Sequence, residues 1–92
     1  MAEKDFSKLL YSAVMTLKSE EECQHLFEDL CTPKEIKSIA QRFAVAKMLS
    51  EGSIYNDIVD ETGASTATIS RVNRTMSKGS KTVLERLRTN ND

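Results

Sequence analysis

The segment YNDIVDETGASTATISRVNR, residues 55–74, has the pattern of two short helices joined by a tight turn. Its ninth residue is Gly63, at a position where the backbone must adopt a left-handed conformation that is inexpensive only for glycine. Four apolar residues stand where they would pack the two helices together, namely Ile58, Val59, Ile69 and Val72. The segment therefore predicts a helix-turn-helix over about residues 55–76.

The second helix of this pair carries small, polar and basic side chains between its apolar residues. These are Thr66, Ala67, Thr68, Ser70 and Arg71. Side chains of this kind can approach the floor of a DNA groove without a steric clash, and the second helix of such a pair is the one that enters the major groove. Threonine and serine are poor helix formers. Their concentration in one short helix therefore favours a binding surface over an ordinary solvated face.

Positive charge is concentrated after the turn. Residues 1–61 hold seven Lys or Arg against twelve Asp or Glu, and residues 62–92 hold six against two, so the two parts carry −5 and +4. The basic residues on or after the second helix are Arg71, Arg74, Lys78, Lys81, Arg86 and Arg88. Because phosphate contacts supply most of the non-specific affinity for DNA, this asymmetry favours double-stranded DNA as the partner.

Apolar residues at helical spacing predict two helices near the N-terminus. A stripe from Phe6 to Leu17 repeats every three to four residues. Ser19 followed by Glu22 is a capping-box pattern, in which a hydroxyl and a carboxylate each bind a free backbone N–H. A second apolar stripe, ending at Leu30, follows this start signal.

The segment Thr32–Glu35, TPKE, is the strongest helix start signal in the chain, with a capping threonine, a proline at the first helical position and a glutamate that completes the box. It predicts a helix to about Ser50 that is ended by Gly52. Apolar residues cover more than one face of this helix, so we expect it to be the central element. Ser53 should begin the next helix, and a break at Ser77–Ser80 should precede a short last helix and a frayed polar tail.

Ninety-two residues, 39% of them apolar, suit a single helical domain over residues 1–92. The helices outside the predicted pair are too apolar for one short chain to cover. We therefore expect a homodimer formed through about residues 5–50 and 80–88. A twofold dimer would bind a palindromic site whose half-sites lie one helical turn apart.

Several classes of protein are not favoured by the sequence. It has one histidine, His25, no glycine-rich phosphate loop, and neither a metal-ligand cluster nor a candidate catalytic residue. Cys23 and Cys31 lie in apolar surroundings, about 12 Å apart if they share a helix, so we expect reduced thiols rather than a disulfide. The N-terminus, MAEKDF, lacks a signal peptide and no apolar run is long enough to span a membrane, so we expect a cytoplasmic protein. Because no candidate catalytic residue is present, we also expect that it is not an enzyme.

One alternative function stays open from the residues alone. Glu20–Glu22 would give the N-terminal half an acidic surface, which would suit a helical dimeric interaction module that binds another protein and no DNA. The same glutamates are also an ordinary acidic first turn, favoured by the helix dipole. We therefore rank this alternative below DNA binding.

An ordered set of residues resembles the tryptophan repressor family, and within it the YerC/YecD-type relatives. The set is CTPKE at Cys31–Glu35, then Arg42, Gly52 and ATISR at Ala67–Arg71, and the resemblance runs from about Leu30 to Leu87. It implies an all-α, six-helix tryptophan-repressor-like fold and an intertwined homodimer. It also implies a sequence-specific transcriptional regulator, a repressor that binds a palindromic operator.

The resemblance also assigns roles to residues. It implies base-facing positions at Thr66, Ala67 and Thr68. It implies positions at or near phosphate for Gln41, Arg42, Thr68, Ser70 and Arg74, to which the charge pattern adds Arg71 and Lys78. A ligand pocket for the family's corepressor, L-tryptophan, is implied at Thr32, Arg42, Arg71 and Thr75, with the two arginines on either side of the indole.

The sequence departs from the family's pattern around that pocket. Val72 stands where the family has a glycine beside the ligand, and its branched side chain should intrude on the indole. Thr75 replaces a serine, Cys31 replaces a leucine, and one residue is missing between the two glycines at 52 and 63. We therefore expect no cofactor, with L-tryptophan or another small effector as the alternative. Arg42 and Arg71 would then both serve phosphate.

Overall fold

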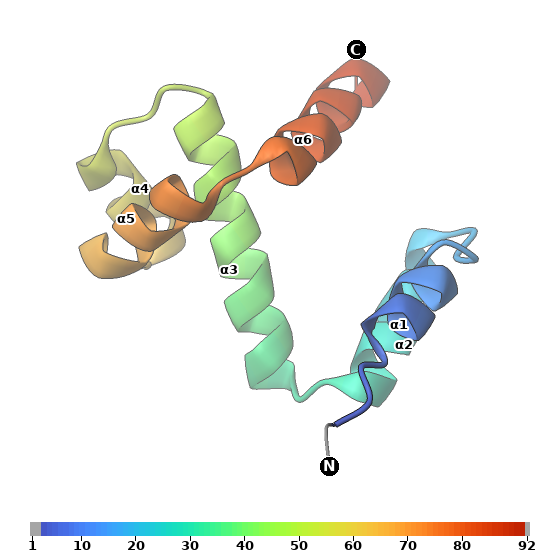
Figure 1. Ribbon diagram of the computed structural model, residues 1–92. Coiled ribbons are helices and arrows are strands. Elements are labelled where there is room, and N and C mark those ends of the chain that lie inside the picture. Colours follow the sequence, from blue (N-terminus) through green and yellow to red (C-terminus); the bar gives the residue numbers. More distant parts are fainter. Residues whose placement is uncertain (1–2, 92) are drawn as a thin grey trace. The chain divides into compact units, whose positions relative to one another are not determined.

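The computed structural model describes residues 3–91, and in that range it contains six α-helices and no strand (Figure 1). In chain order the helices are α1 (Ser7–Val14), α2 (Glu20–Leu30), α3 (Pro33–Ser50), α4 (Tyr55–Thr62), α5 (Thr66–Thr75) and α6 (Lys78–Asn91). The predicted all-α, six-helix fold is thus confirmed. Contacts divide the chain into two compact units, Met1–Ile36 and Lys37–Asp92, which are described one at a time. The expected single domain stays a prediction.

The start of α2 in the first unit follows the predicted capping pattern. The Ser19 hydroxyl accepts the Glu22 N–H at 3.1 Å, and the Glu22 carboxylate accepts the Lys18 N–H at 2.9 Å. The hydroxyl thereby binds one N–H that the helix cannot satisfy internally, and the carboxylate binds the N–H one residue before the cap rather than that of the cap itself. The glutamates of the first turn, Glu20–Glu22, lie where the helix dipole favours negative charge.

The apolar side chains of the first unit remain largely open to solvent in the single chain. Neither α1 nor α2 buries a residue over its described length. Phe6 is 67% exposed, Leu9 69%, Met15 82% and Leu30 60%. Cys23 and Cys31 are free thiols of intermediate burial. The apolar stripes that the sequence shows therefore have no cover within this chain.

The start of α3 is a reciprocal capping box at the predicted residues. The Glu35 N–H donates to the Thr32 hydroxyl at 3.1 Å, and the Thr32 N–H donates to the Glu35 carboxylate at 2.8 Å. Acceptance of the Thr32 backbone N–H lowers the pKa of the Glu35 carboxyl. Because the folded pKa lies below the unfolded one, this bond stabilises the helix above the unfolded pKa and is lost as the pH falls through the folded pKa.

The core of the molecule lies in the second unit, among α3, α4, α5 and α6. Its buried residues are Val45, Ala46, Ile58, Ala64, Ile69, Val72 and Leu84. Three of these side chains, Val45, Ile58 and Ile69, are fully buried, and they come from three different helices. The helix pair α4–α5 is therefore fixed against the C-terminal half of α3 by apolar contact, with α4 and α5 side by side (Figure 1).

Two helix boundaries differ from the sequence expectation. Helix α4 begins at Tyr55 rather than at Ser53, with Ile54 at the N-cap. The expected break before the last helix is present but lies at Met76 and Ser77, so its predicted extent to Ser80 was wrong. Helix α6 begins at Lys78 and extends to Asn91, so the expected frayed tail was wrong for the described residues. Glycine costs only about 1 kcal/mol relative to alanine in a helix, and the burial of Leu84 in the core offsets that cost for α6.

No helix within residues 3–91 is both long and apolar enough to span a membrane.

Candidate nucleic-acid interface

The connection between α4 and α5 is a three-residue turn whose geometry is fixed by local hydrogen bonds. Gly63 has a left-handed backbone, with φ of 73°, and its N–H donates to the Val59 carbonyl at 2.9 Å. Ala64 is 2% exposed and belongs to the core. The hydroxyl of Ser65 caps α5 by accepting the Thr68 N–H at 3.1 Å. The glycine and the cap predicted from the sequence are thus both present.

A side chain from α3 supports this turn from outside. The Gln41 Nε2 donates to the carbonyl of Thr62 at 3.0 Å, across 21 residues of sequence. That carbonyl belongs to the last turn of α4, where backbone oxygens have no partner within the helix. No pattern in the sequence marks this contact, because periodicity and capping patterns report only near neighbours. The phosphate-facing role assigned to Gln41 stays a prediction, and the structure gives its amide an internal partner.

Replacement of Gly63 by alanine is expected to lower the free energy of unfolding by about 1 kcal/mol, because an L-residue is strained in the left-handed region. A Cβ at this position would lie 4.0 Å from the Gln41 Nε2, an ordinary contact, so the loss comes from the backbone. Gly79, inside helix α6 with no positive φ, is the matched control. Gly79→Ala should stabilise the protein by up to about 1 kcal/mol. Urea unfolding monitored by circular dichroism measures both; equal signs for the two variants would contradict the assigned turn.

Helix α5 exposes the residues that the sequence predicts to face DNA. Thr66, Ala67, Arg71 and Arg74 are exposed, and Thr68 and Ser70 are of intermediate burial. The opposite side of the helix carries Ile69 and Val72, which lie in the core. The exposed residues Thr66, Ala67, Arg71 and Arg74 are called here the outer face of α5. The buried side chains of Ile69 and Val72 fix α5 in place, and its outer face is open to a ligand.

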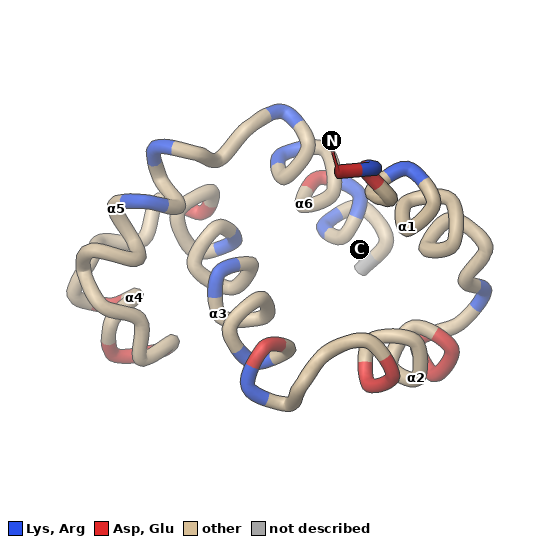
Figure 2. Tube along the Cα trace, turned by 60° about the horizontal axis from the view of Figure 1, so that its bottom comes forward, with Lys and Arg blue, Asp and Glu red and all other residues tan. Residues whose placement is uncertain are grey.

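Helices α4 and α5 carry charges of opposite sign, as Figure 2 shows with basic residues in blue and acidic residues in red. Helix α5 carries Arg71 and Arg74 and no acidic residue, while α4 carries acidic residues and no basic one. Within residues 3–91 the ion pairs are Lys47–Glu51 and Arg88–Glu85. The arginines of α5 are therefore not neutralised by a carboxylate in the described part of the chain.

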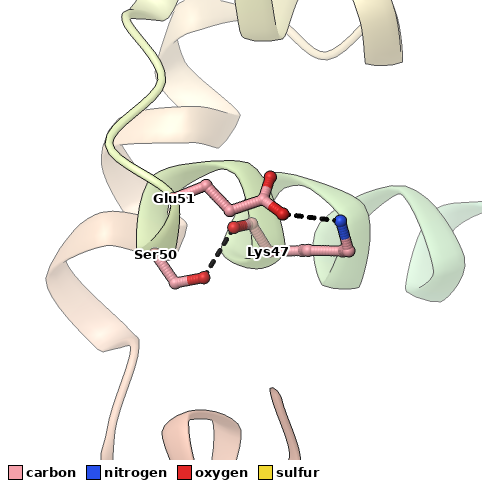
Figure 3. Close-up of polar contacts among 3 residues, drawn as sticks. All are labelled: Lys47, Ser50 and Glu51. Carbon is pink, nitrogen blue, oxygen red and sulfur yellow. Dashed lines mark hydrogen bonds and ion pairs between the residues drawn. The ribbon is translucent and has the colours of Figure 1, made fainter. Parts of the chain in front are cut away.

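The pair at the end of α3 shows which cations are already engaged (Figure 3). The Lys47 Nζ lies 2.7 Å from the Glu51 carboxylate, and the Ser50 hydroxyl donates to the Lys47 carbonyl at 2.6 Å. Such an exposed i,i+4 pair contributes only about 0.3–0.5 kcal/mol to stability. Its main effect is local, because it offsets the charge of Lys47. Arg42, on the same helix, is in no ion pair among residues 3–91.

A pocket of about 490 Å³ lies between α3 and α5. Its lining consists of Ser38, Gln41 and Arg42 from α3 and Thr68, Arg71, Val72 and Thr75 from α5. It thus brings together three of the four residues of the implied ligand pocket, and the fourth, Thr32, belongs to the first unit and caps α3. Among residues 3–91 no cluster of three or more histidine, cysteine or acidic side chains is arranged to hold a metal ion.

Comparisons with known proteins agree with this arrangement. The family model of the Trp repressor protein matches residues 6–91. The YerC protein of Bacillus subtilis (strain 168) is 56% identical over 70 residues, which are 76% of this chain and 67% of that protein. The crystal structure of a TrpR-like protein from Eubacterium eligens ATCC 27750 is 52% identical and superposes with a TM-score of 0.84, over 87% of this chain and 86% of the other.

A second crystal structure extends the match to nearly the whole chain. It is of a Staphylococcus aureus protein whose name also refers to the Trp repressor, and it is 42% identical with a TM-score of 0.82 over 94% of this chain and 96% of the other. The matches define the class, a small all-helical DNA-binding regulator with a Trp-repressor-like fold. The chain belongs to the Trp repressor protein family, which confirms the resemblance found in the sequence.

Proposed function

We propose that this protein is a homodimeric, sequence-specific transcriptional repressor that acts in the cytoplasm and binds a palindromic operator. In this proposal α4 and α5 form a helix-turn-helix, and α5 is the recognition helix that enters the major groove. The observation that carries the proposal is the outer face of α5. It exposes small and basic side chains while Ile69 and Val72 anchor the same helix in the core.

The division of labour along α5 follows from the size and charge of its side chains. Thr66, Ala67 and Thr68 lie in the first turn and are small enough to reach base edges, where threonine offers a methyl group and a hydroxyl. Arg71, Arg74 and Ser70 lie further along and would bind backbone phosphates. Lys78, exposed at the start of α6, and Arg42 on α3 would extend the phosphate contacts.

The proposed dimer is supported by apolar side chains that the single chain leaves open. Phe6 and Leu9 are about two thirds exposed, Ile39 is 48% exposed, and Leu87 is 42% exposed. These residues belong to the segments 5–50 and 80–88 predicted for dimerisation. A second copy that covers them would bury apolar area, and each Å² buried would stabilise the dimer by about 25 cal/mol. It would also place two recognition helices on successive turns of the duplex.

Selection of bound sequences from random double-stranded DNA by the purified protein, with and without L-tryptophan, tests the proposal. We expect enrichment of a palindrome with half-sites about 10 base pairs apart. Light scattering of the free protein should give the mass of two chains. Absence of any salt-sensitive DNA binding would contradict the proposal and favour the alternative of a helical dimer that binds another protein.

Substitution Arg71→Ala is expected to weaken operator binding about tenfold for each copy, because one charge-assisted contact to phosphate is lost. The slope of log affinity against log salt should become shallower by about 0.9 for each phosphate contact removed. Lys4→Ala is the control, because Lys4 is exposed and lies outside both α5 and the segments predicted for dimerisation, so operator affinity should stay at the wild-type value. Fluorescence polarisation over a range of salt concentrations measures both variants. An unchanged slope for Arg71→Ala would remove Arg71 from the interface.

A further inference from the structure

The pocket between α3 and α5 has the chemistry of an anion site. Among its lining residues, Val72 is the one aliphatic side chain, and it is 9% exposed because it belongs to the core. The lining carries two guanidinium groups, from Arg42 and Arg71, and no carboxylate. Neither arginine is in an ion pair among the described residues. A ligand in this pocket therefore meets two positive charges that the protein itself leaves uncompensated.

The pocket offers two hydroxyl hydrogens that the protein itself does not use. The Ser65 hydroxyl donates to the Thr68 oxygen at 3.1 Å, which leaves the Thr68 hydrogen available. The Arg42 Nη2 lies 3.4 Å from the Ser38 oxygen, which likewise leaves the Ser38 hydrogen available. The Thr75 hydroxyl already donates to the Arg71 carbonyl at 2.9 Å. Two hydroxyl donors and two guanidinium groups thus meet at one cavity, an arrangement suited to a ligand made of acceptor oxygens.

These observations disagree with the corepressor that the family implies. Two guanidinium planes can stack on an aromatic ring, but an indole also needs apolar walls, and here the lining is mostly polar. Val72 also lies in the lining, and it puts a branched side chain where the family has a glycine beside the indole. The residues of this pocket therefore do not fit L-tryptophan.

We propose that the pocket between α3 and α5 binds a phosphate group, held by Arg42 and Arg71 and by the hydroxyls of Ser38 and Thr68. A phosphate presents acceptor oxygens to the donors just described and carries the net negative charge that the two guanidinium groups require. Either the DNA backbone or a small phosphorylated molecule can supply the group.

A small phosphorylated molecule in this pocket opposes DNA binding, a step that rests on the proposed function. Arg71 is assigned above to a backbone phosphate, and one guanidinium group cannot bind two phosphates at full strength. A small phosphate compound therefore acts as an inducer that releases the operator. This sign of regulation is opposite to that of a corepressor, which strengthens DNA binding.

Titration of the free, full-length protein with inorganic phosphate tests the pocket directly. Sodium chloride at matched ionic strength is the reference, and the NMR shifts of the arginine side-chain Nε–H groups are the readout. We expect saturable shifts of Arg42 and Arg71 with phosphate and none with chloride. L-Tryptophan should give no saturable shift. Phosphate shifts no larger than those with chloride, or preferential saturation by L-tryptophan, would overturn the proposal.

Matched variants separate the pocket from general surface charge. Arg42→Gln and Arg71→Gln should each weaken phosphate binding about tenfold, because each removes a charge-assisted hydrogen bond. Arg88→Gln removes the same charge from α6, outside the pocket, and should bind phosphate like the wild type. Equal affinities in all three variants would overturn the proposal. Should a variant fail to fold by circular dichroism, the wild-type titration still decides.

Operator binding at constant ionic strength, with chloride replaced by phosphate, identifies the source of the group. A loss of operator affinity that is specific to phosphate, and absent in Arg71→Gln, shows that the small ion and the DNA backbone share the pocket. Unchanged operator affinity together with saturable phosphate shifts would overturn the inducer step and leave the pocket as a phosphate site that operator DNA does not use. Failure of DNA binding with phosphate binding intact would sink the regulator proposal and leave the pocket assignment standing.

Discussion

Replacement of Ile69 by alanine is expected to lower the free energy of unfolding by about 2–5 kcal/mol. Ile69 is 0% exposed and joins α5 to side chains from α3 and α4. Truncation removes buried apolar area and leaves a cavity that a core of this size cannot refill. The core lies in the second unit, Lys37–Asp92, which is smaller than the about 70–80 residues below which a single core rarely supplies more than about 3–5 kcal/mol. The variant should therefore lose most of its folded α4–α5 pair at room temperature.

Ile54→Ala provides the matched control for this substitution. Ile54 is 62% exposed and lies just before α4, so its truncation should change stability by no more than about 0.5 kcal/mol. Urea unfolding by circular dichroism, at equal protein concentrations, compares the two isoleucines. A loss for Ile69→Ala no larger than that for Ile54→Ala would show that α5 is not anchored as described.

Substitution Ala67→Glu is expected to lower operator affinity at least about 100-fold, because a carboxylate directed at phosphates and base edges meets like charge and lacks a partner. The same change should leave folding intact. Ala67 is exposed in the first turn of α5, which holds no acidic residue, and a glutamate there is favoured by the helix dipole by about 0.3–1 kcal/mol. Affinity and stability should thus change independently, which separates a defect in recognition from a defect in folding.

The neutral variant Ala67→Gln controls for the size of the new side chain. It should keep operator affinity to within about tenfold and shift the preferred base at one position of each half-site, because an amide can pair with adenine. Polarisation measures affinity, and thermal unfolding monitored by circular dichroism measures stability. Wild-type operator affinity for Ala67→Glu in a folded protein would mean that the first turn of α5 does not face DNA.

The local features of the fold could be predicted from the sequence because short-range chemistry decides them. Thr32 with Glu35, and Ser65 with the start of α5, bind free backbone N–H groups within three residues. A left-handed Gly63 is likewise required by the turn itself. Such features need no knowledge of what lies elsewhere in the chain.

Other features could not be predicted because they depend on tertiary contacts or on a balance among neighbouring residues. The hydrogen bond from Gln41 to Thr62 joins α3 to α4 across 21 residues of sequence, and no pattern in the sequence marks it. Helix α6 starts at Lys78, directly before Gly79 and Ser80 of the predicted break, because the burial of Leu84 in the core offsets their low helix propensity. The family resemblance already implied that Arg42 and Arg71 share a pocket, but the hydroxyl donors of Ser38 and Thr68 beside them became visible only in the structure.

The acidic side chains of α4, which stand directly before the basic α5 in sequence, bear on how a protein of this kind finds its site. For a chain that reads DNA as proposed, a collision in which α4 leads is repelled by the duplex, whereas one in which α5 leads is attracted. Electrostatic forces thereby favour encounters in which α5 faces the DNA before any contact with a base is made. This preference acts over roughly the Debye length, about 8 Å at physiological ionic strength, so association should become both faster and more selective in orientation as salt is removed.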